Sequence, residues 1–287
     1  MKRIMYVMLL LSGISCLAKK EYPHEQLFAR HIDQMWDGHV TYLLSYPRSG
    51  NTLTRYIIER ITRRPTMGVR KRPAKFDSPL VFSFTELPTD ITLKPVWKIH
   101  KSPHITRTPF YDPHKTKVIL LVRNYKELAF RYEQYGKIDM FNHNGSLNEK
   151  NLIAALDHWS GDAASRELYF ASLRLFDEIP DQNKLLIYYE DLVLNPDDVI
   201  YRLGEFFGCD EKVVQRMIAE LDECRQRILS FYNVHQHSWS RGNDVRYYSK
   251  RKAYRQCVQI DKWVKQHYSD LWQRYLSIYD ESNFRTS

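Results

Sequence analysis

A short polar loop carries most of the chemistry that this sequence can be expected to perform. Residues 45–52 read SYPRSGNT and lie between an apolar run and a stretch with helical spacing. A glycine-containing turn at the start of a helix directs backbone N–H groups into the loop, where the helix dipole also favours negative charge. Ser49, Asn51 and Thr52 add side-chain donors, and Arg48 adds a fixed positive charge. The loop is therefore predicted to bind a phosphate-like anion.

This loop departs from the phosphate-binding loop of nucleotide triphosphatases, G-x-x-x-x-G-K-[ST]. It lacks the first glycine, and Asn51 occupies the position of the lysine. We expect Gly50 to let a phosphate approach the backbone closely, because a Cβ atom there would obstruct it. The residues thus predict a phosphate site that is not a standard ATPase loop. The alternative is an ordinary turn before a capped helix.

A second candidate group stands at Lys98 and His100, at the end of another apolar run. Alternation along a strand places both side chains on the same face, so both can reach one site. A neutral imidazole near pH 7 can accept the proton of an attacking hydroxyl group. His100 is one of 11 histidines, so a structural role is the alternative to catalysis.

Alternating strands and helices must position these groups. The predicted strands are residues 40–46, 95–100, 117–122 and 184–189, and helical spacing covers residues 51–62, 126–135, 147–175 and 196–207. Short buried strands that alternate with helices predict an α/β fold with a largely parallel sheet. The loops after the strands then share one edge, where ligands bind in such folds. Residues 19–287 show no evident linker and are expected to form one domain, with residues 65–95 as an irregular lid or binding loop.

The residues from Tyr46 to Thr52 resemble the 5′-phosphosulfate loop, Y-P-[KR]-S-G-[TN]-T, of sulfotransferases that use 3′-phosphoadenosine 5′-phosphosulfate (PAPS). They look most like the cytosolic-type family and its bacterial relatives. The resemblance implies a P-loop-like three-layer fold, with a central mainly parallel β-sheet flanked by helices. It also implies in-line transfer of a sulfuryl group from PAPS to a hydroxyl or amine. His100 matches the general base of the family's K-x-H motif, and Arg48 and Lys98 would neutralise charge on the leaving oxygen.

Three further segments extend the resemblance. Arg123 begins an element similar to R-N-P-x-[DE], which binds the cofactor's 3′-phosphate, and Arg131 stands where the family usually has serine. An arginine fork also suits phosphate, although Arg123 could instead be a salt-bridged surface residue. Tyr189 matches the second tyrosine of a Y-Y-E-D motif, which packs near adenine, and Arg241-Gly242 resembles the R-K-G loop that closes over the 3′-phosphate. The predicted cofactor-binding residues are Arg48, Ser49, Gly50, Asn51, Thr52, Arg123, Arg131, Tyr189, Arg241 and Gly242.

The charge balance leaves two interpretations open, a generally basic surface or an anionic partner. The chain has 43 lysines and arginines against 34 acidic residues, a net charge of +9. Arg63-Arg64 and residues 70–72 (RKR) lie in a region that approaches the acceptor in the resembling enzymes. An acidic glycan or acidic peptide is the expected acceptor, because basic residues raise the local concentration of such partners. The alternative is that these residues only solubilise a loop.

Two other classes of protein remain open. A P-loop kinase would share the fold, but the loop lysine and the Mg²⁺ ligands that it needs are not evident. A basic module that binds nucleic acid or glycan without catalysis would use the 20 tyrosines and the mixed aromatic and basic residues 246–252. For the sulfotransferase interpretation no nucleic acid partner and no metal are expected, because arginine and lysine supply the charge and no H-x-x-H or C-x-x-C motif is present.

The N-terminal residues 1–18 have the pattern of a secretory signal peptide. Lys2 and Arg3 precede an apolar stretch, and small residues end at Ala18. The pattern predicts the secretory pathway or export, with membrane contact only if the segment is retained as a short anchor. The alternative is a cytoplasmic protein. Cleavage would leave Cys209, Cys224 and Cys257, an odd number that leaves at least one free thiol or an intermolecular bond.

Overall fold

The structure is a computed structural model of the chain. It describes residues 40–46, 49–64, 66–68, 96–99, 106, 111–136, 139–157, 168–223 and 251–280. The predicted signal segment, residues 1–18, lies outside these ranges. Within them, no helix combines the length and the apolar character that a bilayer span requires.

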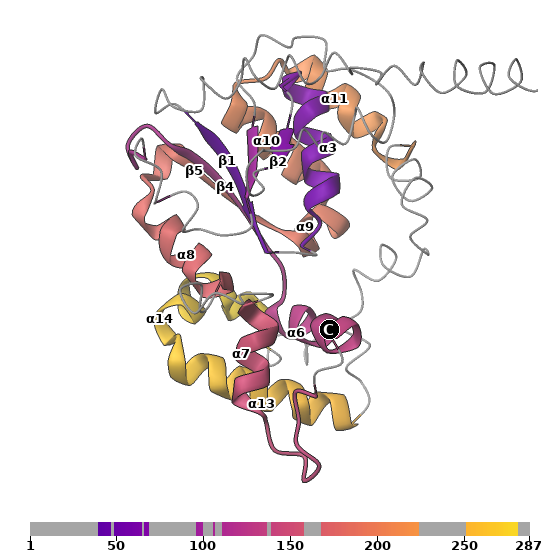
Figure 1. The fold of residues 1–287 in the computed structure, drawn as a ribbon. Coiled ribbons are helices and arrows are strands. Elements are labelled where there is room, and N and C mark those ends of the chain that lie inside the picture. Colours follow the sequence, from indigo (N-terminus) through magenta and orange to yellow (C-terminus); the bar gives the residue numbers. More distant parts are fainter. Residues whose placement is uncertain are drawn as a thin grey trace, which may run out of the picture.

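A five-stranded parallel sheet forms the centre of the fold, with the strand order β2-β3-β1-β4-β5 (Figure 1). Its strands are β1 (Thr41–Ser45), β2 (Thr66–Gly68), β3 (Val96–Ile99), β4 (Lys117–Val122) and β5 (Lys184–Tyr188). Four of them coincide with the predicted runs. The fifth, β2, lies in the segment expected to be irregular, so that expectation is wrong at its start. The predicted α/β fold, with a parallel sheet flanked by helices, is confirmed.

Burial on both faces explains why these strands are apolar throughout. Leu43 of β1 packs on one side with residues of α3 (Asn51–Thr62), α10 (Pro196–Phe207) and α11 (Glu211–Ala219). Tyr42 and Leu44 pack on the other side in a second cluster. That cluster draws on α6 (Tyr125–Gly136), α7 (Glu149–Asp157), α8 (Leu168–Glu178), α13 (Arg251–His267) and α14 (Ser269–Leu271). The sheet thus separates two hydrophobic cores.

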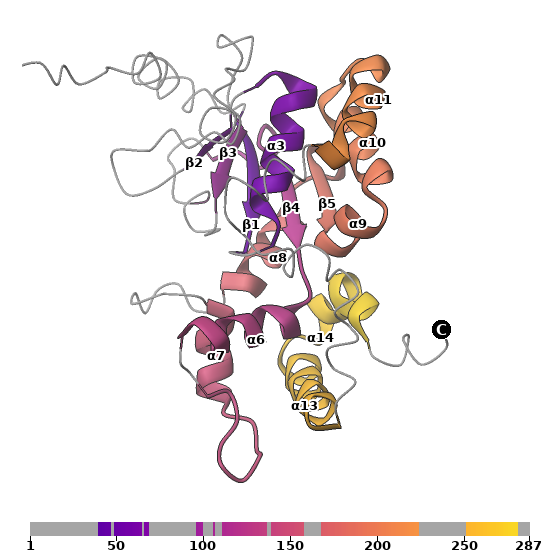
Figure 2. The same ribbon diagram turned by 90° about the vertical axis from the view of Figure 1, so that its right-hand side faces the viewer.

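The second group of helices extends well beyond the sheet. Both views show α6, α7 and α13 below the carboxyl ends of the strands, whereas α3, α10 and α11 flank the sheet itself (Figures 1 and 2). The described part of the chain ends with a π-helical turn, η5 (Trp272–Leu276), and a 3₁₀ turn, η6 (Ser277–Tyr279). This C-terminal segment therefore lies on the side of the sheet edge where ligands bind in parallel α/β folds.

The helix boundaries agree with the sequence where local signals are strong. α3 and α10 have the predicted bounds, and α10 begins at Pro196 and ends before Gly208, which has a φ of 65°. The predicted helical stretch 147–175 corresponds to α7 and α8, and residues between them lie outside the described ranges. The predicted strand 184–189 ends one residue earlier than expected, and α9 (Tyr189–Leu194) begins directly after it.

Candidate functional site

The loop between β1 and α3 lies at the carboxyl edge of the central strand. Ser49 is fully buried, and its backbone N–H donates to the carbonyl of Tyr46 over 3.2 Å. The Oγ of Ser49 is buried and has no hydrogen-bond partner in the described part of the chain. A buried hydroxyl without a partner is costly and calls for an explanation. An anion held in the loop would provide the missing acceptor.

The start of α3 is built to favour negative charge. Gly50 precedes the helix, no acidic residue stands in its first turn, and the N–H of Thr54 already donates to the Gly50 carbonyl. The N–H groups before Thr54 have no intrahelical acceptor, because helix geometry provides none for the first turn. The Asn51 amide donates to Ser45 Oγ over 2.5 Å, which fixes one side of the loop. Thr52 is half-buried beside it.

Gly50 is required for a reason different from the one expected. Its φ is +84°, in the left-handed region, and a Cβ atom there would lie 2.5 Å from Cδ2 and 2.8 Å from Cε2 of Tyr189. Such contacts are shorter than real Cβ contacts, so the ring would have to move. The space that the sequence analysis assigned to a phosphate at this Cβ position is filled by an aromatic ring.

The turn after β4 places Arg123 over the same ring. Its guanidinium carbon lies 3.9 Å from the centroid of the Tyr189 ring. Arg123 is 4% exposed and forms a bidentate pair with Glu127, in which Nε donates to Oε2 over 2.9 Å and Nη2 donates to Oε1. Burial opposes the charge of Arg123, but the Glu127 carboxylate raises its pKa above the ordinary value. A salt-bridged surface arginine was the alternative to phosphate binding. The ion pair is present, but Arg123 is buried, and 3′-phosphate binding stays a prediction.

Tyr189 therefore joins the two predicted anion-binding elements. It is buried, and its ring lies against the backbone of Gly50 and against the Arg123 guanidinium. The structure thus brings together residues that are far apart in the sequence and that the sequence analysis assigned to opposite ends of one nucleotide. Packing of Tyr189 near adenine stays a prediction.

Glu190 is a site residue that the sequence analysis did not single out. Its Oε1 accepts from the backbone N–H of Asn124 over 3.1 Å, and its Oε2 accepts from the hydroxyl of Tyr279 over 2.7 Å. Burial raises the pKa of Glu190, while these two hydrogen bonds and the nearby Arg123 act in the opposite direction. Its position inside the Y-Y-E-D motif was the available signal, but its partners lie in other elements.

Several predicted residues cannot be placed. Arg48, His100, Arg241 and Gly242 lie outside the described residues. The backbones of Lys98 and Arg131 belong to β3 and α6, but their side chains are outside the description. Lys98 pairs in register with Leu43 of β1, so β3 ends at the same sheet edge as the β1–α3 loop.

Two residues of the expected basic lid lie at the opposite edge of the sheet. Arg63 caps the C-terminal end of α3, and Arg64 follows it. The guanidinium of Arg64 lies 3.3 Å from Thr41 Oγ1, at the amino end of β1, and 5.4 Å from the centroid of the Phe207 ring. Burial lowers the pKa of Arg64. The expectation of an acceptor lid is therefore wrong for these two arginines, and residues 70–72 lie outside the described residues.

The described residues contain no group of three or more histidine, cysteine or acidic residues that could hold a metal ion. Cys209 is a free thiol, Cys257 is buried, and Cys224 lies outside the description.

Comparison with known proteins identifies the family. A family model described as the sulfotransferase domain matches residues 39–282. A mouse sulfotransferase, SULT7A1, complexed with PAP, is 19% identical, with 68% of each chain covered and a TM-score of 0.41. The sulfotransferase domain of the Synechococcus PCC 7002 olefin synthase is 17% identical, over 61% of this chain and 75% of that one, with a TM-score of 0.39. A retinol dehydratase in a complex with retinol and PAP is 16% identical, over 70% and 69%, with a TM-score of 0.42.

These structural similarities are too distant to carry an argument of their own. A search of curated protein sequences finds no match. The family match nevertheless spans the sheet, both hydrophobic cores and every candidate site residue. The chain belongs to the sulfotransferase domain family.

Proposed function

We propose that this sulfotransferase uses PAPS as its donor and transfers the sulfuryl group to a hydroxyl or amine of its acceptor. The observation that carries the proposal is the buried hydroxyl of Ser49 beneath the start of α3, which has no partner among the residues that the structure describes. A phosphate oxygen can accept hydrogen bonds from both this hydroxyl and the helix N–H groups. When bound, PAPS would supply the sulfuryl group, and PAP would leave with the electron pair of the broken S–O bond.

The residues around the loop fit the 5′ end of that donor. Ser49, Thr52 and the backbone around Gly50 would hold the 5′-phosphate, and Arg48 and Lys98 would neutralise the charge that develops on the leaving oxygen. Donors that are already in position when charge develops give the largest share of many enzymatic rate enhancements. The absence of acidic residues from the first turn of α3 supports this assignment.

The turn after β4 is proposed to serve the 3′ end. Arg123, Arg131 and the Arg241-Gly242 segment would bind the 3′-phosphate, and Tyr189 would border the adenine. Arg123 already faces the Glu127 carboxylate, so a phosphate near it would add a second anion to the same cation. The ring of Tyr189 supports the proposal, because it links this turn to Gly50.

His100 is proposed as the general base. Its imidazole would take the proton from the acceptor hydroxyl as the oxygen attacks sulfur. Arginine and lysine supply the positive charge in this mechanism, so the proposal includes no metal and no nucleic acid partner.

The acceptor is proposed to be an acidic glycan or acidic peptide. The net charge of +9 supports this class. Of the basic residues expected to form a lid, residues 70–72 remain as candidates. Replacing Arg70, Lys71 and Arg72 with glutamine should raise the KM for the acceptor without changing PAP affinity. Arg63→Gln is the matched control, because Arg63 is exposed at the opposite sheet edge. Efficient sulfation of small neutral phenols by all these variants would contradict the proposal.

The compartment is proposed from residues 1–18, whose pattern supports the secretory pathway or export. A lumen that imports PAPS would be a compatible setting, and membrane contact follows only if the segment is kept. N-terminal sequencing of the mature protein tests this, and an intact Met1 would favour the cytoplasm.

A thermal-shift screen with PAP, PAPS, ATP and GTP tests the donor before any acceptor is known. We expect PAP and PAPS to raise the melting temperature, since a ligand that binds only the folded state stabilises it. Arg48→Ala should lose this shift, whereas Arg60→Ala, at the other end of α3, should keep it. Stabilisation and turnover by ATP with Mg²⁺, without a response to PAP, would contradict the proposal and favour a kinase.

A further inference from the structure

Three elements hold the Arg123–Asn124 turn, two of them by hydrogen bonds to its backbone. Tyr169, in α8, donates its hydroxyl to the Arg123 carbonyl over 2.8 Å. Glu190, at the start of α9, accepts from the Asn124 N–H over 3.1 Å. The third element is α6, which begins directly after the turn and is bound to the C-terminal segment by polar contacts.

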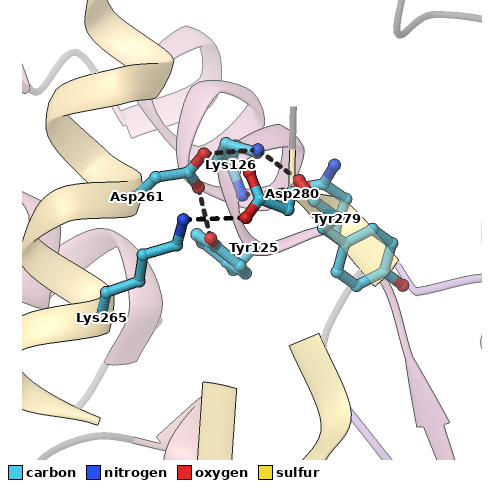
Figure 3. Close-up of polar contacts among 7 residues, drawn as sticks. Tyr125, Lys126, Asp261, Lys265, Tyr279 and Asp280 are labelled. Atoms are coloured by element: carbon cyan, nitrogen blue, oxygen red, sulfur yellow. Dashed lines mark hydrogen bonds and ion pairs between the residues drawn. The ribbon is translucent and has the colours of Figure 1, made fainter. Parts of the chain in front are cut away.

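That fastening consists of a buried ion pair (Figure 3). Lys126 is 2% exposed, and its Nζ lies 3.0 Å from Asp261 Oδ2 and 2.7 Å from the carbonyl oxygen of Tyr279. The hydroxyl of Tyr125 donates to the other carboxylate oxygen of Asp261. Buried ion pairs add little net stability, but their geometry can specify one arrangement of the chain. Here the arrangement fixes the first turn of α6 on α13.

Tyr279 connects this ion pair to Glu190. Its carbonyl accepts from Lys126, and its hydroxyl donates to Glu190 Oε2 over 2.7 Å. Its ring packs edge-on against Tyr125 and Tyr188, with centroid distances of 6.4 and 5.9 Å. Tyr279 thus contacts both α6, which follows the turn, and the start of α9.

Glu190 is also adjacent in the chain to the residue that both anion-binding elements contact. It directly follows Tyr189, whose ring contacts both Gly50 and the Arg123 guanidinium. A shift of Glu190 would therefore move both the ring and the Asn124 N–H. A nucleoside 3′,5′-bisphosphate carries one phosphate at each end, so its binding would depend on the distance between the two elements.

We propose that Tyr279 is a positioning residue that, through Glu190 and Lys126, sets the Arg123–Asn124 turn for recognition of the 3′-phosphate. The inference rests on the proposed function, because it takes the donor product to be a 3′,5′-bisphosphate. Tyr279 acts only through its partners and touches no reacting atom in this account.

The test compares Tyr279→Phe with Tyr275→Phe. The first variant removes the hydroxyl bond to Glu190 but keeps the ring and the carbonyl bond to Lys126. Tyr275 is the matched control, since its hydroxyl donates to Asp177 in α8, away from the turn. Calorimetric titration with PAP and with 5′-AMP, which lacks the 3′-phosphate, gives an affinity ratio for each protein. We expect Tyr279→Phe to lower the PAP-to-AMP ratio about tenfold, as for the loss of one hydrogen bond to a charged group, and Tyr275→Phe to leave it unchanged.

A merely structural role would weaken PAP and AMP equally or leave both unchanged, and either result overturns the inference. Wild-type protein that binds no PAP overturns the proposed function as well, so the two failures are distinguishable. If Tyr279→Phe does not fold, Glu190→Ala and Glu190→Gln answer the same question. Glutamine can accept from Asn124 and donate to Tyr279, so it should keep the ratio that alanine loses. Equal ratios in these two variants would contradict the inference.

Discussion

The contact between Gly50 and Tyr189 can be tested by adding a single methyl group. Gly50→Ala introduces two costs. A non-glycine residue at a φ of +84° pays about 1–2 kcal/mol for the left-handed conformation. The new Cβ would also lie 2.5 Å from Tyr189 Cδ2, and overpacking of this kind costs about 1–3 kcal/mol. We expect Gly50→Ala to lower the free energy of unfolding by about 2–5 kcal/mol in total.

Gly145→Ala separates the two costs. Gly145 has a similar φ of +81°, but a Cβ there meets nothing within 4 Å. The free energy of unfolding of this variant should therefore fall only by the conformational term of about 1–2 kcal/mol. Urea unfolding of both variants measures the difference, because the midpoint reports stability when the slope is unchanged.

A double-mutant cycle tests whether Tyr189 causes the extra loss of unfolding free energy in Gly50→Ala relative to Gly145→Ala. In a Tyr189→Ala background the ring is gone, so Gly50→Ala should cost no more than Gly145→Ala. If Gly50→Ala has the same cost with and without the ring, the packing of Tyr189 on this loop is refuted. PAP affinity measured on the same proteins shows whether the ring also maintains the binding site.

Four further outcomes follow from the site. Ser49→Ala should lose about 10-fold or more in PAP affinity without losing stability, because its Oγ has no partner in the described residues; a drop in melting temperature with PAP affinity intact would contradict this. His100→Ala should lose turnover about 10²–10⁴-fold and still bind PAP, whereas an unfolded variant would favour a structural histidine. Lys126→Met should cost about 3–5 kcal/mol of unfolding free energy, since it leaves Asp261 buried without its cation; an unchanged urea midpoint would argue against the pair. Burial raises the pKa of the Glu190 carboxyl, so the folded protein loses stability as this group ionises with rising pH. The melting temperature of Glu190→Gln relative to wild type should therefore increase from about pH 4 to pH 7; parallel pH profiles would contradict this.

Local sequence signals predicted the elements that carry the anion loop. β4, α3 and α10 have the predicted bounds, because apolar runs there stop at residues with strong turn or helix-start preferences. β2 could not be predicted in this way. It has three residues, too few for a periodicity, and it exists because Thr66 to Gly68 pair with β3 some 30 residues later.

Tertiary partners explain what else the sequence analysis missed. Glu190 acquires its role from Tyr279, which is 89 positions away in the chain. No spacing rule links them. The misplaced arginines have a simpler cause: Arg63 follows a helix of 12 residues, which at about 1.5 Å per residue carries the chain from the carboxyl edge of the sheet to its amino edge.

A crystal structure of the protein with PAP tests the proposed donor site directly. We expect the 5′-phosphate to lie at the start of α3 and to accept a hydrogen bond from Ser49 Oγ, with the 3′-phosphate at the Arg123–Asn124 turn. PAP bound elsewhere, with Ser49 Oγ still without a partner, would contradict it.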